Sequence, residues 1–149
     1  MSQPLLPWNE KIAPSKLRKK RKSESQFWNQ LKRAIKKHHP SWNPIRLEST
    51  ASLGLPDVVV AANGNFAMWE LKVCTANAVR ISAHQIAFAE THSQYPVWMI
   101  ICCNTSKGET IRAYHARDVM AVSEIGLRHP PQIEVTPPDW LPLFNLLSP

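Results

Sequence analysis

Three ionisable residues have the types and the spacing needed to handle a phosphate group. Asp57 begins the apolar run from Asp57 to Ala62, and Glu70 and Lys72 lie in a second run from Asn65 to Val73. Two carboxylates can hold a divalent cation, and a nearby ammonium can orient a water molecule beside it. Oxygen ligands of this kind suit Mg²⁺, with Mn²⁺ as an alternative, better than Zn²⁺.

The dipeptide Asn63-Gly64 between these runs predicts how they pair. Asn-Gly favours a two-residue β-hairpin turn, so Ala62 should pair with Asn65. Counting back from the turn places Asp57 opposite Glu70, and the alternation of side chains places Lys72 on the same face. The same face carries four apolar residues that we expect to point into a core: Val59, Ala61, Phe66 and Met68.

Two carboxylates that face each other across a sheet destabilise it unless a positive charge lies between them. A divalent cation would supply that charge, with Lys72 orienting or helping to deprotonate the attacking water and offsetting the charge that develops on the phosphate. The alternative is a purely structural cluster, in which Lys72 neutralises Asp57 and Glu70 by salt bridges.

Two further polar residues lie on predicted helices that could approach this site. Glu24 precedes Phe27 and Trp28 by three and four residues, which predicts that it lies on the apolar, inward stripe of its helix. It is either a further acid of the site or a favourable charge near the positive end of the helix dipole. Gln85 closes a Ser-x-x-Gln capping box that begins at Ser82, and its helical face could also reach the site.

The order of the predicted elements indicates an α/β domain with a mixed central β-sheet flanked by helices. Besides the hairpin, periodicity predicts helices over 23–38, 83–92 and 118–125, and strands over 45–47, 97–103 and 110–115. We expect residues 1–22 to be a flexible basic arm and residues 23–128 the catalytic domain. Residues 129–149 form a Pro- and Leu-rich tail that should pack on the domain or on a partner subunit.

Positive charge is concentrated near the N-terminus. Ten of the 18 Lys and Arg residues fall between Lys16 and Lys37, where Glu24 is the one acid. Such a segment suits DNA, because neutralised phosphates release counterions, although RNA and a role as a solubilising or targeting tail remain alternatives. The residues expected to contact DNA are Lys19, Lys20, Arg21, Lys22, Arg33, Lys36, Lys37, Ser52, Arg80 and His84.

The three cysteines form neither a disulfide framework nor a CxxC metal pattern, so we expect reduced core residues. The N-terminus lacks the apolar stretch of a secretory signal, and the longest apolar run, Tyr95–Cys103, is too short to span a bilayer. We expect a soluble intracellular protein that has no membrane partner and no small-molecule cofactor.

Gly54-Leu55-Pro56-Asp57 followed by Glu70-Leu71-Lys72 resembles the PD-(D/E)XK nuclease superfamily, whose fold is restriction-endonuclease-like. The resemblance implies that Asp57 and Glu70 bind magnesium, that the backbone carbonyl of Leu71 helps, and that Lys72 acts on the attacking water. Arg80-Ile81-Ser82 with Gln85 is similar to a downstream motif of many members, including virus-type replication-repair nucleases, which would place the protein in a host cytoplasm.

Glu24 resembles the acid that archaeal-type Holliday-junction resolvases carry on their first helix, although the loop before Asp57 has a single glycine where resolvases have several. By this resemblance the chain is a homodimeric magnesium-dependent endonuclease that cuts branched DNA. One alternative is a sequence-specific duplex endonuclease of restriction or homing type. Another, from a different class, is a DNA-binding module in which the carboxylates are structural.

Overall fold

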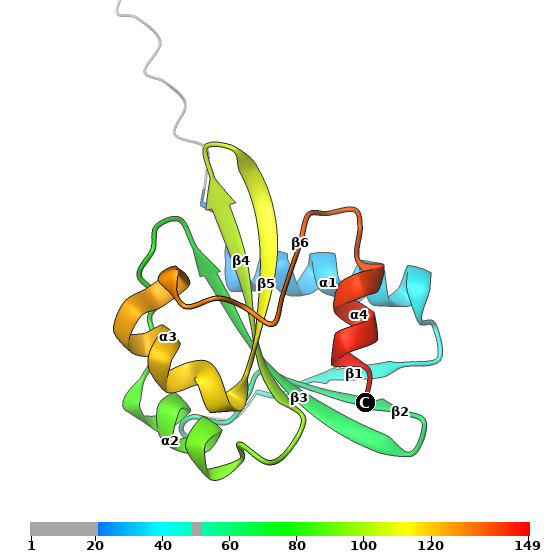
Figure 1. Cartoon of the computed structure of the whole chain (residues 1–149). Helices are drawn as coiled ribbons and strands as arrows, with labels where there is room; N and C mark the ends of the chain where they lie inside the picture. The colour runs from blue at the N-terminus through cyan, green and yellow to red at the C-terminus, as the bar shows by residue number, and fades with distance from the viewer. Residues whose placement is uncertain (1–20, 49–51) are drawn as a thin grey trace, which may run out of the picture.

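The protein is described by a computed structural model that covers residues 21–48 and 52–149. Its centre is a six-stranded sheet in the order β1-β2-β3-β4-β5-β6, in which β3 and β4 are parallel and all other neighbours are antiparallel (Figure 1). This confirms the predicted mixed sheet. The strands are β1 (Asn43–Arg46), β2 (Val58–Ala62), β3 (Asn65–Cys74), β4 (Val97–Thr105), β5 (Gly108–His115) and β6 (Ile133–Val135).

Helices cover both faces of the sheet, α2 and α3 on one side and α1 and α4 on the other (Figure 1). They are α1 (Glu24–His38), α2 (Ala83–Thr91), α3 (Val119–Ile125) and α4 (Leu141–Leu147), with short 3-10 turns over Ala116–Asp118 and Gly126–Arg128. Among the residues described, no helix is both long enough and apolar enough to cross a membrane.

The β2–β3 hairpin has the register predicted from its turn. Ala62 pairs with Asn65 and Val58 with Trp69, and both turn residues, Asn63 and Gly64, have positive φ. That conformation belongs to the hairpin turn that Asn-Gly favours. The ladder ends at Val58, so Asp57 lies just outside the strand, level with Glu70.

The expectation that Val59, Ala61, Phe66 and Met68 point into a core holds only for Met68, which packs, partly buried, against the core under α2 and α3. Val59, Ala61 and Met68 are only half-buried and Phe66 is 64% exposed, whereas the alternate residues of the hairpin are packed under α1 and α4. Both faces of this hairpin are apolar, so alternation could not indicate which one a helix covers. The core set of the hairpin is Val58, Val60, Ala62, Ala67, Trp69 and Leu71.

The C-terminal residues belong to the same packed unit. β6 extends the sheet by pairing with β5, and α4 lies beside α1, where Leu143, Phe144 and Leu147 have no exposed surface. The Pro- and Leu-rich segment therefore packs on the sheet of its own chain. Its apolar side chains complete the core that α1 leaves open.

We expect Leu143→Ala to lower the free energy of unfolding by about 2–5 kcal/mol, because it removes a fully buried side chain and leaves a cavity. Leu141→Ala, in the same helix at a position 47% exposed, should change it by less than about 0.5 kcal/mol. Urea unfolding of both variants checks this. Equal stability of the two would contradict the placement of α4 in the core.

Candidate active site

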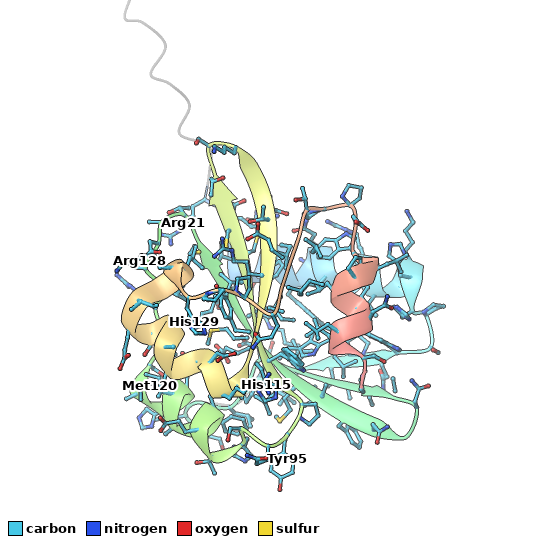
Figure 2. The ribbon with its side chains drawn as sticks, viewed as in Figure 1. Arg21, Tyr95, His115, Met120, Arg128 and His129 are labelled. Carbon is cyan, nitrogen blue, oxygen red and sulfur yellow. The ribbon has the colours of Figure 1, made fainter. Side chains whose placement is uncertain are left out.

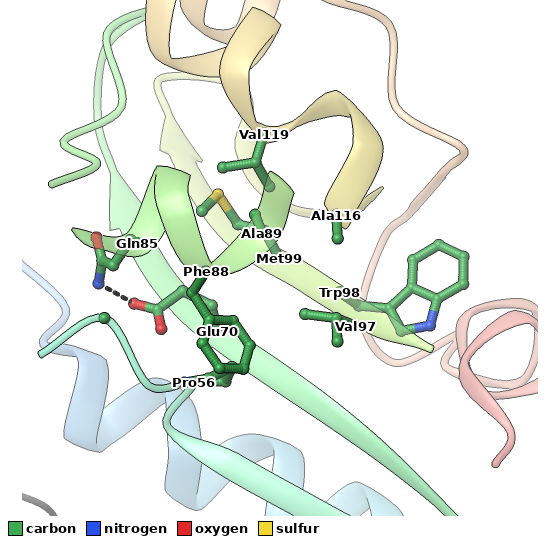
Figure 3. A pocket seen from close by; sticks show the side chains of 11 residues that line it. Pro56, Glu70, Gln85, Phe88, Ala89, Val97, Trp98, Met99, Ala116 and Val119 are labelled. Atoms are coloured by element: carbon green, nitrogen blue, oxygen red, sulfur yellow. Dashed lines mark hydrogen bonds between the residues drawn. The ribbon is translucent and has the colours of Figure 1, made fainter. Parts of the chain in front are cut away.

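Glu70 is a buried carboxylate, and it lies at the centre of the candidate site. It is 7% exposed on β3, and its Oε1 accepts a hydrogen bond from Gln85 Nε2 at 2.5 Å (Figure 3). Lys72 Nζ lies 3.3 Å from the same oxygen. The other oxygen, Oε2, is buried and has no hydrogen-bond partner in the part of the chain that is described. A buried oxygen without a hydrogen-bond partner lowers the stability of the fold, so a bound water molecule or ion at this atom would be favourable.

The surroundings of Glu70 disfavour its charged form. Burial, first, and the negative charge of Asp57, second, raise the pKa of the carboxyl from 4.5 to about 7, and Lys72 only partly offsets the rise. Near neutral pH the group is therefore divided between its protonated and ionised forms. A cation placed beside it would remove the proton and restore the carboxylate.

Asp57 is fixed by the backbone of the neighbouring strand. Its Oδ2 accepts a hydrogen bond from the N–H of Leu71 at 2.8 Å, and its own carbonyl accepts one from the N–H of Leu47 at 2.7 Å. The N–H and C=O of one strand residue point to the same side. The carbonyl of Leu71 is therefore directed to the Asp57 side of β3, where the two carboxylates meet.

Gln85 has both of the roles between which the sequence could not decide. Its Oε1 accepts from the backbone N–H of Ser82, while Ser82 Oγ accepts from the N–H of Gln85, which closes the predicted capping box. The free end of the same amide, Nε2, donates to Glu70. The cap therefore fixes the rotamer of the side chain that holds the buried carboxylate.

Gly54 lets the loop before Asp57 lie directly against α2. Its φ is +84°, and a Cβ at this position would be 2.3 Å from the backbone oxygen of His84. A larger residue would force the loop away from the helix, and with it Pro56, which is buried, and Asp57. The single glycine of this loop therefore lies at the position where a positive φ and the close approach to His84 require it.

A small, partly open pocket of about 20 Å³ borders Glu70. Apart from Glu70 and Gln85 its side chains are apolar, among them Phe88, Val97 and Met99 (Figure 3). That volume admits about one water molecule. The apolar lining explains why desolvation is the largest contribution to the pKa of Glu70.

Glu24 does not lie on an inward stripe, and that expectation is wrong. Its side chain is largely solvent-exposed in the first turn of α1. Glu24 is nevertheless close enough to the site for the charges of Asp57 and Lys72 to act on its carboxyl group. Partial burial raises the pKa of its carboxyl, Lys72 and Arg46 oppose the rise, and Asp57 adds to it.

The carboxylates do not gather into a larger cluster. Within residues 21–48 and 52–149, no three His, Cys, Asp or Glu side chains come together as a group that could hold a metal ion. A cation at this site would therefore rely on Asp57 and Glu70, a backbone oxygen and water. Arg46, at the end of β1, is a positive charge near Glu24 that the sequence analysis did not identify. The pairing of this short strand with β2, which brings Arg46 close to the site, could not be predicted from the sequence.

A groove of about 560 Å³ lies on the solvent side of Lys72. Arg80 and Ser82, just before α2, line it together with Lys72 and Gln85. The structure thus places Arg80, a predicted DNA contact, in the same groove as Lys72. A phosphate group in this groove would meet two positive charges.

The other predicted DNA contacts are spread over the surface. Arg33, Lys36 and Lys37 are exposed on α1, and Arg21 (Figure 2), Ser52 and His84 are also exposed. Lys22 is paired instead with Glu109 on β5 and donates to Gln30 at 2.6 Å, so it ties the start of α1 to the sheet. Lys19 and Lys20 lie outside the described residues.

No protein-family model matches the chain, and no curated protein matches it. Among solved structures, it is similar to Hjc, a Holliday junction resolvase from the archaeal hyperthermophile Archaeoglobus fulgidus. The sequence identity is 14% and the TM-score 0.45, over 62% of this chain and 77% of that one. A likeness this distant leaves the activity to be inferred from the site.

Gln85→Ala should cost more stability than Gln26→Ala, although each removes the same type of capping box. Each substitution removes the N3 side chain that accepts from the N-cap N–H and leaves the N-cap Ser in place, which costs less than the roughly 1 kcal/mol of a lost N-cap. Gln85→Ala also leaves the buried Glu70 Oε1 without its amide donor, which adds about 1–3 kcal/mol. Denaturant unfolding above pH 7, where Glu70 is mostly ionised, measures the difference; equal costs would show that the contact with Glu70 contributes nothing.

Proposed function

We propose that this chain is a nuclease that hydrolyses phosphodiester bonds in DNA with a divalent metal ion held at Asp57 and Glu70. The observation that carries the proposal is the buried Glu70 Oε2, which has no partner among the described residues although it lies next to a second carboxylate. Lys72 is already engaged with Oε1. A single ammonium therefore leaves one negative charge and one buried oxygen uncompensated.

The donor atoms fit Mg²⁺, with Mn²⁺ as a substitute. Asp57 and Glu70 offer carboxylate oxygens, and the carbonyl of Leu71 is directed to the same side. Few protein ligands, all of them hard oxygens, leave positions for water and for a phosphate oxygen, which is how Mg²⁺ is usually bound. A bound Mg²⁺ would lower the pKa of a water ligand and stabilise the charge that develops on phosphorus.

The remaining residues position and polarise the reactants. Lys72 Nζ, held near Glu70 Oε1, can orient the attacking water and offset developing negative charge. Gln85 keeps the carboxylate of Glu70 from rotating. Glu24, on the solvent side, is proposed as an auxiliary acid that acts on the metal through a bound water molecule.

The exposed cations define a path along which bound DNA would cross the molecule. Arg80 lines the same groove as Lys72, and α1 runs from Glu24, near the site, to exposed cations in its second half, Lys32, Arg33, Lys36 and Lys37. With a rise of 1.5 Å per residue, Lys36 lies about 18 Å along the helix from Glu24. Contacts of this kind bind phosphates and carry no sequence information, which favours a substrate chosen by its shape, such as branched DNA.

We also propose that the chain acts as a homodimer through the uncovered face of the hairpin. Ile45, Val59 and Met68 form one cross-strand row on that face. Phe66 and Tyr95 (Figure 2 labels Tyr95) are 64% and 61% exposed. They line a neighbouring hollow of about 550 Å³ whose lining has no Asp, Glu, Lys or Arg. An apolar, uncharged surface can pair with itself about a two-fold axis.

Lys72→Ala and Asp57→Asn should each slow Mg²⁺-dependent DNA cleavage by about 100-fold or more, because they remove the positioned ammonium and a metal ligand. Lys107→Ala, which removes an exposed cation at the β4–β5 turn, should leave the rate unchanged. Labelled four-way junction, flap, linear duplex and single strand serve as substrates. Cleavage that survives in both variants excludes this mechanism, and cleavage of linear duplex at one sequence would favour the restriction-type alternative.

Phe66→Asp should convert the protein to a monomer, because it places a charge in the middle of the proposed apolar interface. Met120→Asp, at an exposed apolar position of α3 on another part of the surface, should not. Sedimentation equilibrium of wild-type protein and both variants gives the masses. A monomeric wild-type protein at high concentration would contradict the dimer.

A further inference from the structure

Two buried thiols face each other across the parallel strand pair at the centre of the sheet. Cys74 is the last residue of β3, and it pairs directly with Cys103 of β4. Their Sγ atoms are 3.8 Å apart, and the residues are 4% and 3% exposed. Both belong to the face covered by α2 and α3, which is the face that carries Glu70 and Lys72.

The backbone between these residues already has the dimensions of a disulfide. Adjacent strands lie about 4.8 Å apart, which is within the Cα separations that disulfides span. The sulfur atoms have to approach from 3.8 Å to about 2.0 Å, a movement that side-chain rotation supplies while β3 and β4 stay paired. Cys102 cannot take part, because its side chain points to the opposite face, among the residues packed under α1 and α4.

A hollow of about 320 Å³ leads to the thiol pair. It is lined by Cys74 and Cys103 together with Asn77, Thr105 and Arg112. A small oxidant fits such a space, whereas a protein disulfide does not. Hydrogen bonding with Cys103, and then the charge of Arg112, lowers the pKa of the Cys74 thiol, while the same contact raises the pKa of Cys103. The positive charge of Arg112, which lines the same hollow, favours a thiolate at Cys74.

We propose that Cys74 and Cys103 are a peroxide-reactive pair that closes into a cross-strand disulfide within the folded chain. The thiolate of Cys74 attacks one oxygen of hydrogen peroxide, the O–O bond breaks, and the hydroxide that leaves takes up a proton to become water. The sulfur of Cys103 then attacks the sulfenic acid on Cys74. The S–S bond forms as the S–O bond breaks, and the hydroxyl leaves with the Cys103 proton as a second water. The peroxide is reduced by the two electrons that the thiols give up.

A disulfide between Cys74 and Cys103 would link the end of β3 covalently to β4. Cys74 follows Lys72 by two residues on the same face of β3. A covalent bond at Cys74 fixes the end of this strand to β4, next to the ammonium of the candidate site. The thiol chemistry itself is independent of the proposed nuclease activity.

The full-length folded protein, treated with hydrogen peroxide, tests the proposal by thiol counting and intact mass. Two of the three thiols should disappear, the mass should fall by two hydrogen atoms, and proteolytic mapping without reductant should recover the peptides of Cys74 and Cys103 joined. A reducing agent should restore all three thiols. This readout needs no substitution and no nuclease substrate.

Cys102→Ala is the matched control, because it changes a buried thiol that is adjacent to Cys103 in sequence but lies on the other face of the sheet. It should retain the link, and Cys74→Ala and Cys103→Ala should both lose it. The proposal is overturned if the folded wild-type protein keeps its three thiols under peroxide, if Cys102 appears in the link, or if the link forms only between chains.

Discussion

Burial of the Glu70 carboxylate is the constraint on which the rest of the site depends. Removing a carboxylate from water is costly, and the proximity of Asp57 adds to that cost, so that the pKa of Glu70 rises to about 7. Gln85 and Lys72 stabilise one of its oxygens and leave the other without a partner among the described residues. A proton or a cation bound at this site therefore stabilises it, and a cation would do so while leaving Glu70 ionised.

The surrounding structure holds that carboxylate with a small number of local contacts. The end of the β2 ladder releases Asp57 to bond the N–H of Leu71. The capping box of α2 fixes Gln85, and the close approach of Gly54 to α2 fixes the loop that leads into Asp57. Asp57 and Gln85 each contact β3, and Gly54 holds its loop against α2, so the position of the charged groups depends on the docking of α2 as much as on the sheet.

Local rules made part of this arrangement predictable from the sequence. The Asn63-Gly64 turn determines the hairpin register, and Ser-x-x-Gln determines the start of α2, because both depend on residues close together in the chain. Which face of the hairpin is covered could not be predicted, because both faces are apolar and α1 and α4, which pack on one of them, are distant from the hairpin in sequence. The same holds for the approach of Gly54 to His84 and for the pairing of Lys22 with Glu109.

The metal site at Asp57 and Glu70 is the central claim, and calorimetric titration with Mg²⁺ near pH 7 tests it most directly. Because Glu70 is partly protonated there, a cation that binds it must lower its pKa and release protons. Repeating the titration in buffers with different ionisation enthalpies should therefore reveal proton release that diminishes as the pH rises above 7. Glu70→Gln should bind Mg²⁺ weakly and release none. Absence of Mg²⁺ binding to the wild-type protein, or unchanged binding and proton release in Glu70→Gln, would contradict the account.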